Sequence, residues 1–174
     1  MRNTGNYSPD KGYQWLLGQK QNVKWRDLVW NKLSIPKHKF IMSLLCKNIL
    51  QTKVRLSKMF DIDTTCPLCK AAPEDAHHLF CKCPFTEEAY NKLHNWCLYS
   101  FKSNNLNELF GGVKKAQPGK KRRKLYSILA ATIYFVWKAC NRVVHQGLHM
   151  SSEEITQQIK FHVDTYMRSK IGVK

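Results

Sequence analysis

The chain has 174 residues and a mass of 20.4 kDa, a length that suits one ordinary domain with or without tails. Its 29 lysines and arginines against 12 acidic residues give a net charge of +17, which favours a polyanionic partner, nucleic acid first and an anionic membrane surface second. A hydrophobic content of 43% excludes wholesale disorder, and the longest apolar stretch without a charge, residues 125–137, is too short to span a bilayer.

The first half of the chain predicts four helices from apolar residues that recur three or four positions apart. Helix by helix, these apolar residues are Tyr13, Leu16 and Leu17; Trp25, Leu28 and Val29; Phe40, Ile41, Leu44 and Leu45; and Leu56, Met59 and Phe60. Ser8 is placed to cap the first helix and Thr52 the last, and Pro36 precedes the third.

The second half predicts three further helices by the same spacing. Their apolar faces are Ala89, Tyr90, Leu93 and Trp96; Leu125, Ile128, Leu129, Ile133, Val136, Val143 and Val144; and Ile155, Ile159, Val163 and Met167. The middle helix covers residues 121–145 and ends at Gly147, and Ser151 with Glu154 forms a capping box for the last. No stretch alternates as a strand does, so we expect a mainly α fold, a single compact helical domain around a central loop.

Four cysteines and two histidines crowd into the 18 residues of that loop, 66–83. One interpretation of their spacing is C-x2-C-x8-H-x4-C, formed by Cys66, Cys69, His78 and Cys83. Three thiolates and one imidazole suit one tetrahedral Zn²⁺, and because protein groups fill all four positions the ion would be structural rather than catalytic. The neighbouring residues His77 and Cys81 are alternative ligands, and they would share one face if residues 74–81 were helical.

The number of cysteines also indicates the redox state of the cellular compartment. Seven is an odd number, and the first ten residues lack the apolar core of a signal peptide. A secreted disulfide scaffold normally has an even count and such a peptide, so we expect a reducing compartment. Cys46, Cys97 and Cys140 lie at apolar helical positions, where packing in the core is the default.

The positive charge is unevenly distributed along the chain. Residues 1–60 carry a net charge of +10 and residues 91–174 a net charge of +11, whereas residues 61–90 carry −4. We therefore expect a polyanion to bind the flanks rather than the cysteine-rich segment. The densest basic run, which we expect to lie in a loop over residues 113–124 and to act as a nuclear-import signal or a phosphate contact, comprises Lys114, Lys115, Lys120, Lys121, Arg122, Arg123 and Lys124.

Residues 25–85 resemble the zinc-binding domain at the C-terminal end of reverse transcriptases from plant LINE-type (non-LTR) retrotransposons. The matching segments are residues 29–31, 35–41, 50–56, 66–70 and 78–85, with further similarity at 13–17, 133–138 and 141–142. The resemblance implies a module that helps to bind template RNA or target DNA. It also implies zinc ligands at Cys66, Cys69, His78 and Cys83, so we prefer the last two over His77 and Cys81.

We predict a non-catalytic zinc-binding module that binds RNA or DNA through its basic helical flanks. We expect it in the nucleus, with the cytoplasm as an additional location. Residues 1–112 would form the zinc-binding domain, with its zinc loop at 61–85, and residues 125–174 a helical pair that packs on it. The candidate nucleic-acid contacts are the basic run together with Lys37, Lys39, Lys53 and Arg55.

The main alternative is a protein-interaction module derived from a retroelement and repurposed by the host for a regulatory or defence role. An enzyme is disfavoured: residues 76–78 are faintly similar to an HNH nuclease, but Asn91 and His94 are too close together to complete such a site. The chain also lacks the carboxylate cluster of a ribonuclease H and the paired aspartates of a polymerase. We therefore expect no small-molecule substrate and no membrane partner, and either a stand-alone protein or a truncated retroelement product.

Overall fold

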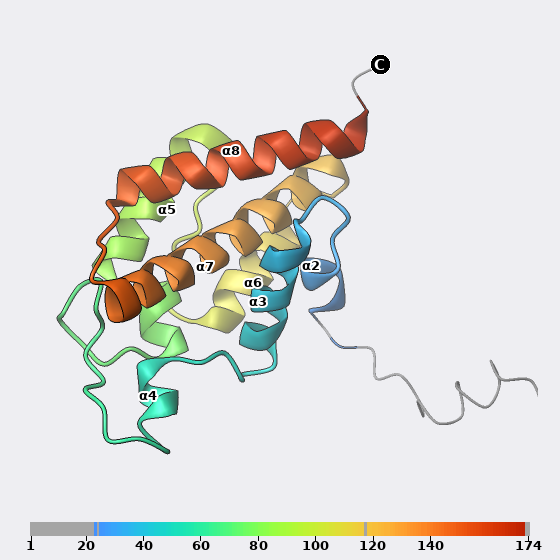
Figure 1. Cartoon of the computed structure of the whole chain (residues 1–174). Coiled ribbons are helices and arrows are strands. Elements are labelled where there is room, and N and C mark those ends of the chain that lie inside the picture. Colours follow the sequence, from blue (N-terminus) through green and yellow to red (C-terminus); the bar gives the residue numbers. More distant parts are fainter. Residues whose placement is uncertain (1–22, 24, 117, 173–174) are drawn as a thin grey trace, which may run out of the picture.

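The computed structural model describes residues 23, 25–116 and 118–172, and the regular elements of that part of the chain are helices (Figure 1). In chain order they are α2 (Arg26–Val29), α3 (Pro36–Cys46), α4 (Lys53–Leu56), the π-helix η1 (His78–Lys82), α5 (Pro84–Cys97), α6 (Leu106–Lys115), α7 (Lys120–Gln146) and α8 (Ser152–Ile171). An isolated bridge joins Thr65 to Pro73. The prediction of a mainly α fold is confirmed, whereas the helix expected after Ser8 lies outside the described residues.

The long helix α7 is the axis of the fold. Its 27 residues make it about 40 Å long, and α2, α3, α6, α8 and η1 all pack against it. Figure 1 shows α8 returning along α7 in the opposite direction, after a short connection. Gly147, with φ of 64°, ends α7 in the left-handed conformation that glycine favours, and the predicted capping box of Ser151 and Glu154 opens α8. None of the described helices combines the length and the apolar character that a membrane crossing needs.

The loop between α2 and α3 is fixed to the first turns of α7. The side-chain amide of Asn31 donates a hydrogen bond of 2.7 Å to the carbonyl oxygen of Arg123, and the Ser127 hydroxyl donates one of 2.7 Å to the carbonyl oxygen of Leu33. Both bonds join segments that are more than ninety residues apart in the chain. They hold α2 and the start of α3 beside the beginning of α7.

Four exposed side chains correct the predicted apolar faces; one is Val144 in the last turn of α7, which is 47% exposed. Phe40 is 62% exposed, because Ile41 and Leu45 occupy the side of α3 that is buried. Met59 and Phe60 are 66% and 60% exposed. The Thr52 cap forms as predicted, but α4 ends after one turn at Leu56, so the two following apolar residues no longer lie on a helix face.

The basic run is mostly helical, which corrects the loop expected at 113–124. Lys115 is the last residue of α6 and Lys120 the first of α7, so residues 116–119 alone connect the two helices. The break at Pro118 and Gly119 is local, and lysine and arginine are good helix formers that continue α7 directly after it. The helix α6 itself was not predicted; Asn105 caps it by accepting a 2.9 Å bond from the Glu108 amide.

Candidate metal centre

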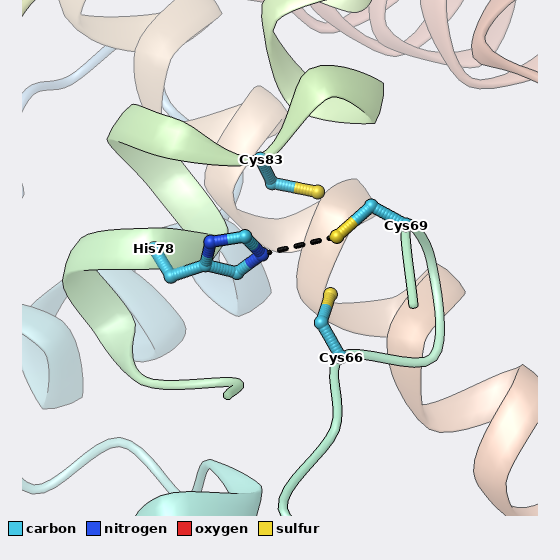
Figure 2. Close-up of side chains that lie close together, drawn as sticks. All are labelled: Cys66, Cys69, His78 and Cys83. Carbon is cyan, nitrogen blue, oxygen red and sulfur yellow. Dashed lines mark hydrogen bonds between the residues drawn. The ribbon is translucent and has the colours of Figure 1, made fainter. Parts of the chain in front are cut away.

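Cys66, Cys69, His78 and Cys83 point toward one another (Figure 2). Their three sulfurs and the His78 ring nitrogen all lie within 4.8 Å of one another, and Cys69 Sγ is 3.2 Å from His78 Nε2. The four ligands of a tetrahedral zinc, with bonds of about 2.0–2.3 Å, are themselves roughly 3.3–3.8 Å apart. Movements on the order of an ångström would therefore close a zinc coordination shell, and the three sulfurs and one imidazole are donors that zinc prefers.

The first pair of cysteines lies on a tight turn. The Lys70 amide donates a 2.8 Å bond to the carbonyl oxygen of Cys66, and the Cys66 amide donates a 2.8 Å bond to that of Ala72. The turn requires a left-handed residue, and Lys70 supplies it with φ of 55°. Because this turn is closed by backbone bonds, it presents Cys66 and Cys69 on the same side.

The second pair depends on the π-helix η1. In an α-helix, side chains five residues apart point about 140° away from each other. In η1 the Cys83 amide instead donates a 2.7 Å bond to the carbonyl oxygen of His78, five residues earlier, and this wider turn brings both side chains to the same side. The H-x4-C spacing therefore works because this turn is not α-helical.

The neighbours of η1 set its two ends. Asp75 starts the turn, because its carboxylate accepts a 2.6 Å bond from the His78 amide. Cys83 has an extended backbone, with φ of −71° and ψ of 123°, as expected for a residue before a proline. Pro84 then begins α5, a position where a missing amide hydrogen costs nothing.

The alternative ligands face a different part of the chain. His77 Nε2 lies 2.7 Å from the carbonyl oxygen of Asn104, and the Ser103 hydroxyl donates a 3.8 Å bond to Cys81 Sγ. Both partners precede α6. Because consecutive residues of a helix point about 100° apart, His77 cannot share the direction of His78. The geometry thus brings together the preferred set of four and leaves His77 and Cys81 outside it.

Burial and the hydrogen bond between the Cys66 and Cys83 side chains shift the pKa values of these two thiols. Cys66 and Cys83 are fully buried, and His78 is 9% exposed. A hydrogen bond from the Cys83 side chain lowers the pKa of the Cys66 thiol, and the same interaction raises the pKa of Cys83. The cluster therefore favours one thiolate, which is the form of cysteine that binds a metal.

Glu74 anchors the zinc loop to the helical core. Its side chain is buried; Oε1 accepts a 3.2 Å bond from the Lys53 amide, and Oε2 accepts one from the thiol of Cys140 on α7. Its backbone oxygen also accepts a 3.1 Å bond from the Val54 amide. Burial raises the pKa of the Glu74 carboxyl. The sequence gives no signal for this role, because nothing in the pattern separates Glu74 from a surface acid.

Two predicted nucleic-acid contacts are instead engaged in bonds to loops of the protein, one of them the zinc loop. Lys53 Nζ lies 3.2 Å from a carboxylate oxygen of Asp63 and donates a 2.9 Å bond to the carbonyl oxygen of Thr65. Arg55 donates a 2.9 Å bond to the carbonyl oxygen of Asn48. We call residues 61–83 the zinc end; Lys53 bonds to it, whereas Arg55 bonds to the loop that follows α3.

The other predicted contacts lie away from the zinc end. Lys114 and Lys115 are the last two residues of α6, and residues 120–124 form the first turns of α7. We call these residues, together with Lys32, the basic end. Residues 122 and 140 of α7 are about 27 Å apart, so the basic end and the Glu74 anchor lie toward opposite ends of that helix. In Figure 1 the start of α7 lies beside α2 and its end lies on the side of α4. Lys37 and Lys39 begin α3, where Lys37 Nζ is 5.2 Å from the centre of the Tyr134 ring.

The fold and the ligand set define a small helical module with one Cys₃His candidate metal centre. Residues 7–90, which include all four candidate ligands, match a family described as zinc-binding in reverse transcriptase. The match supports a reverse-transcriptase zinc-binding domain over this part of the chain, rather than the catalytic part of such an enzyme. Searches among curated proteins and among solved structures found no match.

Proposed function

We propose that this protein is a non-catalytic module that holds one structural Zn²⁺ and binds nucleic acid through its basic end. The observation that carries the zinc assignment is the convergence of Cys66, Cys69, His78 and Cys83 within 4.8 Å, in a segment that matches a zinc-binding family. Four protein ligands leave no coordination position for a substrate, so the ion would order residues 61–83 and not react.

The charge distribution supports nucleic acid as the partner. The zinc end is acidic, whereas cations gather where α6 ends and α7 begins. Lys120 and Lys121 are exposed in the first turn of α7, where positive charge opposes the helix dipole. Gly119 precedes them as the N-cap and offers no side-chain bond to the first amides. A phosphate backbone at this place would offset both costs.

Salt dependence tests the nucleic-acid proposal. If the basic end contacts about five phosphates, the logarithm of the association constant should fall with the logarithm of the salt concentration with a slope near −4. Fluorescence anisotropy of labelled RNA and DNA over a range of salt concentrations measures this slope. Binding that ignores salt, or no binding at low salt, would contradict the proposal.

We further propose a nuclear location and an origin in a plant LINE-type retroelement. The location is supported by the compact run of cations over residues 114–124. A fluorescent fusion of the full chain should accumulate in the nucleus, and the same fusion with glutamines in place of residues 120–124 should not. Equal distribution of both fusions would count against this role of the run.

One observation favours a protein partner as the second candidate. Met59 and Phe60 are exposed side by side between α4 and the zinc end, and such apolar side chains are typical of an interface core. Competition separates the two functions. Heparin should displace a partner held by the basic end, whereas a partner held by Met59 and Phe60 should remain bound.

A further inference from the structure

A cavity of about 340 Å³ opens at the basic end, between the loop after α2 and the first turns of α7. Its volume is in the range of small-ligand sites. The side chains that line it include Asp27, Trp30, Lys32, Arg122, Arg123 and Tyr126. This set combines aromatic surface, three cations and one carboxylate in one place.

Trp30 is an exposed aromatic side chain on a fixed support. It is 62% exposed, yet the next residue, Asn31, is 5% exposed and fully engaged. The Asn31 side chain donates bonds of 3.1 Å to the Ser34 hydroxyl and 2.7 Å to the Arg123 carbonyl oxygen, and accepts one of 3.3 Å from the Leu33 amide. The indole is therefore presented to solvent from a loop that is tied to α7, and not from a mobile segment.

The charged groups around the cavity lack counter-ions in the described part of the chain. The ion pairs found there involve Lys53, Lys92 and Lys102. Neither Asp27 nor Arg123 takes part in one, although both line the same cavity. Arg122 makes a single hydrogen bond, of 3.4 Å, to the carbonyl oxygen of Lys114. Three cations that form no ion pair with a carboxylate among the described residues suit a phosphate, and a carboxylate outside any ion pair there suits an N–H donor.

We propose that this cavity binds one unpaired nucleotide of a single-stranded nucleic acid. The base stacks on the indole of Trp30, its phosphate lies among Lys32, Arg122 and Arg123, and the Asp27 carboxylate accepts a hydrogen bond from an exocyclic amino group of the base. This inference rests on the proposed function and deepens it, because it assigns single strands rather than duplex as the ligand class.

Two features of the cavity favour that ligand over others. A paired base is covered on both faces by its neighbours in the stack, so it cannot reach a tryptophan, whereas an unpaired base can. A site for phosphate alone would gain nothing from Asp27, which repels an anion. Uracil and thymine have no exocyclic amino group and offer only their ring N3–H, so the proposed contact with an amino group predicts weaker binding of those bases than of adenine.

The test measures binding of the full chain to labelled oligoadenylate, oligouridylate and a fully paired hairpin. Trp30→Ala should weaken binding of oligoadenylate by roughly tenfold and leave the hairpin nearly unchanged. Trp30→Phe should retain most of the affinity, because a phenyl ring also stacks. Phe40→Ala is the matched control, since Phe40 is equally exposed at 62% but lies outside this cavity. Thermal melts followed by circular dichroism establish that each variant is folded.

Asp27→Ala tests the contact with the base. Removing the carboxylate should raise affinity for oligouridylate and the hairpin by relieving repulsion. It should also reduce the ratio of adenylate to uridylate binding, because adenylate alone loses a hydrogen bond. An unchanged ratio would overturn the role of Asp27.

The outcomes separate this inference from the proposed function. No salt-dependent binding to any of the probes would overturn the proposed function and the inference together. Salt-dependent binding with equal affinity for single strands and hairpin, or with Trp30→Ala no weaker than Phe40→Ala, would overturn the inference alone.

Discussion

The zinc end and the basic end lie toward opposite ends of one helix, and they are held in different ways. Residues 61–83 contain one short π-helix and otherwise loops and turns, and they belong to the acidic segment of a basic protein. The basic end consists of helix termini, and its adjoining loop is fixed to α7 by Asn31 and Ser127. We expect a segment with so little regular structure to depend on a bound metal for its order, whereas the basic end is ordered by packing. We infer that the zinc end serves the stability of the fold and the basic end serves ligand binding.

The largest effect should come from Cys69→Ser. A structural zinc contributes on the order of 10 kcal/mol to folding the segment that it binds, so losing a ligand should disorder the zinc end. Metal analysis should show the loss of one zinc per chain, and the melting temperature should fall. Hydrogen exchange should show fast exchange over residues 61–83, while residues 125–133 in the buried part of α7 keep most of their protection.

Cys81→Ser is the matched control for that experiment. Cys81 lies in η1, but its sulfur accepts a bond from Ser103 instead of facing the cluster. The variant should keep its zinc and melt close to the wild type. Zinc loss on Cys81→Ser, or an unchanged melt on Cys69→Ser, would contradict the assignment of ligands.

The second-largest effect is a loss of stability at low pH that comes from His38, a residue outside the zinc end. His38 is fully buried, and neither ring nitrogen has a hydrogen-bond partner within the described residues. It faces Tyr134 and Phe135 on α7 and His162 on α8. Burial lowers the pKa of His38 to about 3, with His162 and Lys37 acting in the same direction.

The sign of the pH dependence follows from this shift. Between the ordinary pKa of about 6.5 and the folded value of about 3, the unfolded chain binds more protons at this position, so stability falls as the pH falls. At about pH 4 the loss amounts to about 3 kcal/mol. Denaturant unfolding of His38→Phe and of the wild type should show a difference that shifts in favour of the variant from pH 7 to pH 4. A constant difference would contradict this account.

Acid should also release zinc by protonating its ligands, and both proteins in that comparison share this effect. The difference between the two curves therefore isolates His38 from the zinc end. The metal content at each pH, measured alongside, shows where the zinc end is lost.

Much of the fold follows from the sequence, and the failures are local. The spacing of Leu125, Ile128 and Leu129 predicts α7, and Ser151 with Glu154 predicts the start of α8, because long periodic segments and caps are strong signals. The helix α6 lacks such length. Phe40 shows that the period identifies a helix without fixing which apolar residue faces the core.

For the candidate site as well, the sequence predicts some features and misses others. The spacing narrows the ligands to residues 66–83, and the family resemblance favours His78 and Cys83 over His77 and Cys81; the structure brings that preferred set of four together. The π turn between His78 and Cys83, the anchoring role of Glu74 and the cavity beside Trp30 depend on tertiary contacts. For example, Trp30 and Arg123 line the same cavity because a hydrogen bond joins Asn31 to α7, and no local pattern encodes that bond.

The third-largest effect lies at the basic end, where removing two cations should change stability and nucleic-acid binding in opposite directions. The double variant Lys120→Gln, Lys121→Gln removes two cations from the positive end of the α7 dipole, so it should stabilise the fold by about 1 kcal/mol at low salt. It should also weaken nucleic-acid binding and make the salt slope shallower by up to about 2. Thermal melts and anisotropy titrations measure the two effects.

Lys115→Gln provides the contrast for that variant. Lys115 lies in the last turn of α6, where a cation is favourable, so its loss should cost a few tenths of a kcal/mol while binding also weakens. If both variants changed stability in the same direction, the dipole argument would be wrong.

The smallest effect lies at the zinc end, in the turn that presents the first two cysteines. Lys70 is exposed and has φ of 55°, a left-handed conformation that strains an L-residue and suits glycine. Lys70→Gly should relieve this strain, and after the greater entropy of the unfolded glycine chain is subtracted the fold should gain about 0.5 kcal/mol. Lys58→Gly is the control, because Lys58 is equally an exposed lysine outside a helix but has negative φ; there glycine should cost about 0.5–1 kcal/mol. Chemical denaturation of the zinc-loaded proteins compares the two. Opposite signs would show that the turn carries strain even at the end that we expect zinc to order, and a loss at both positions would show that Lys70 carries none.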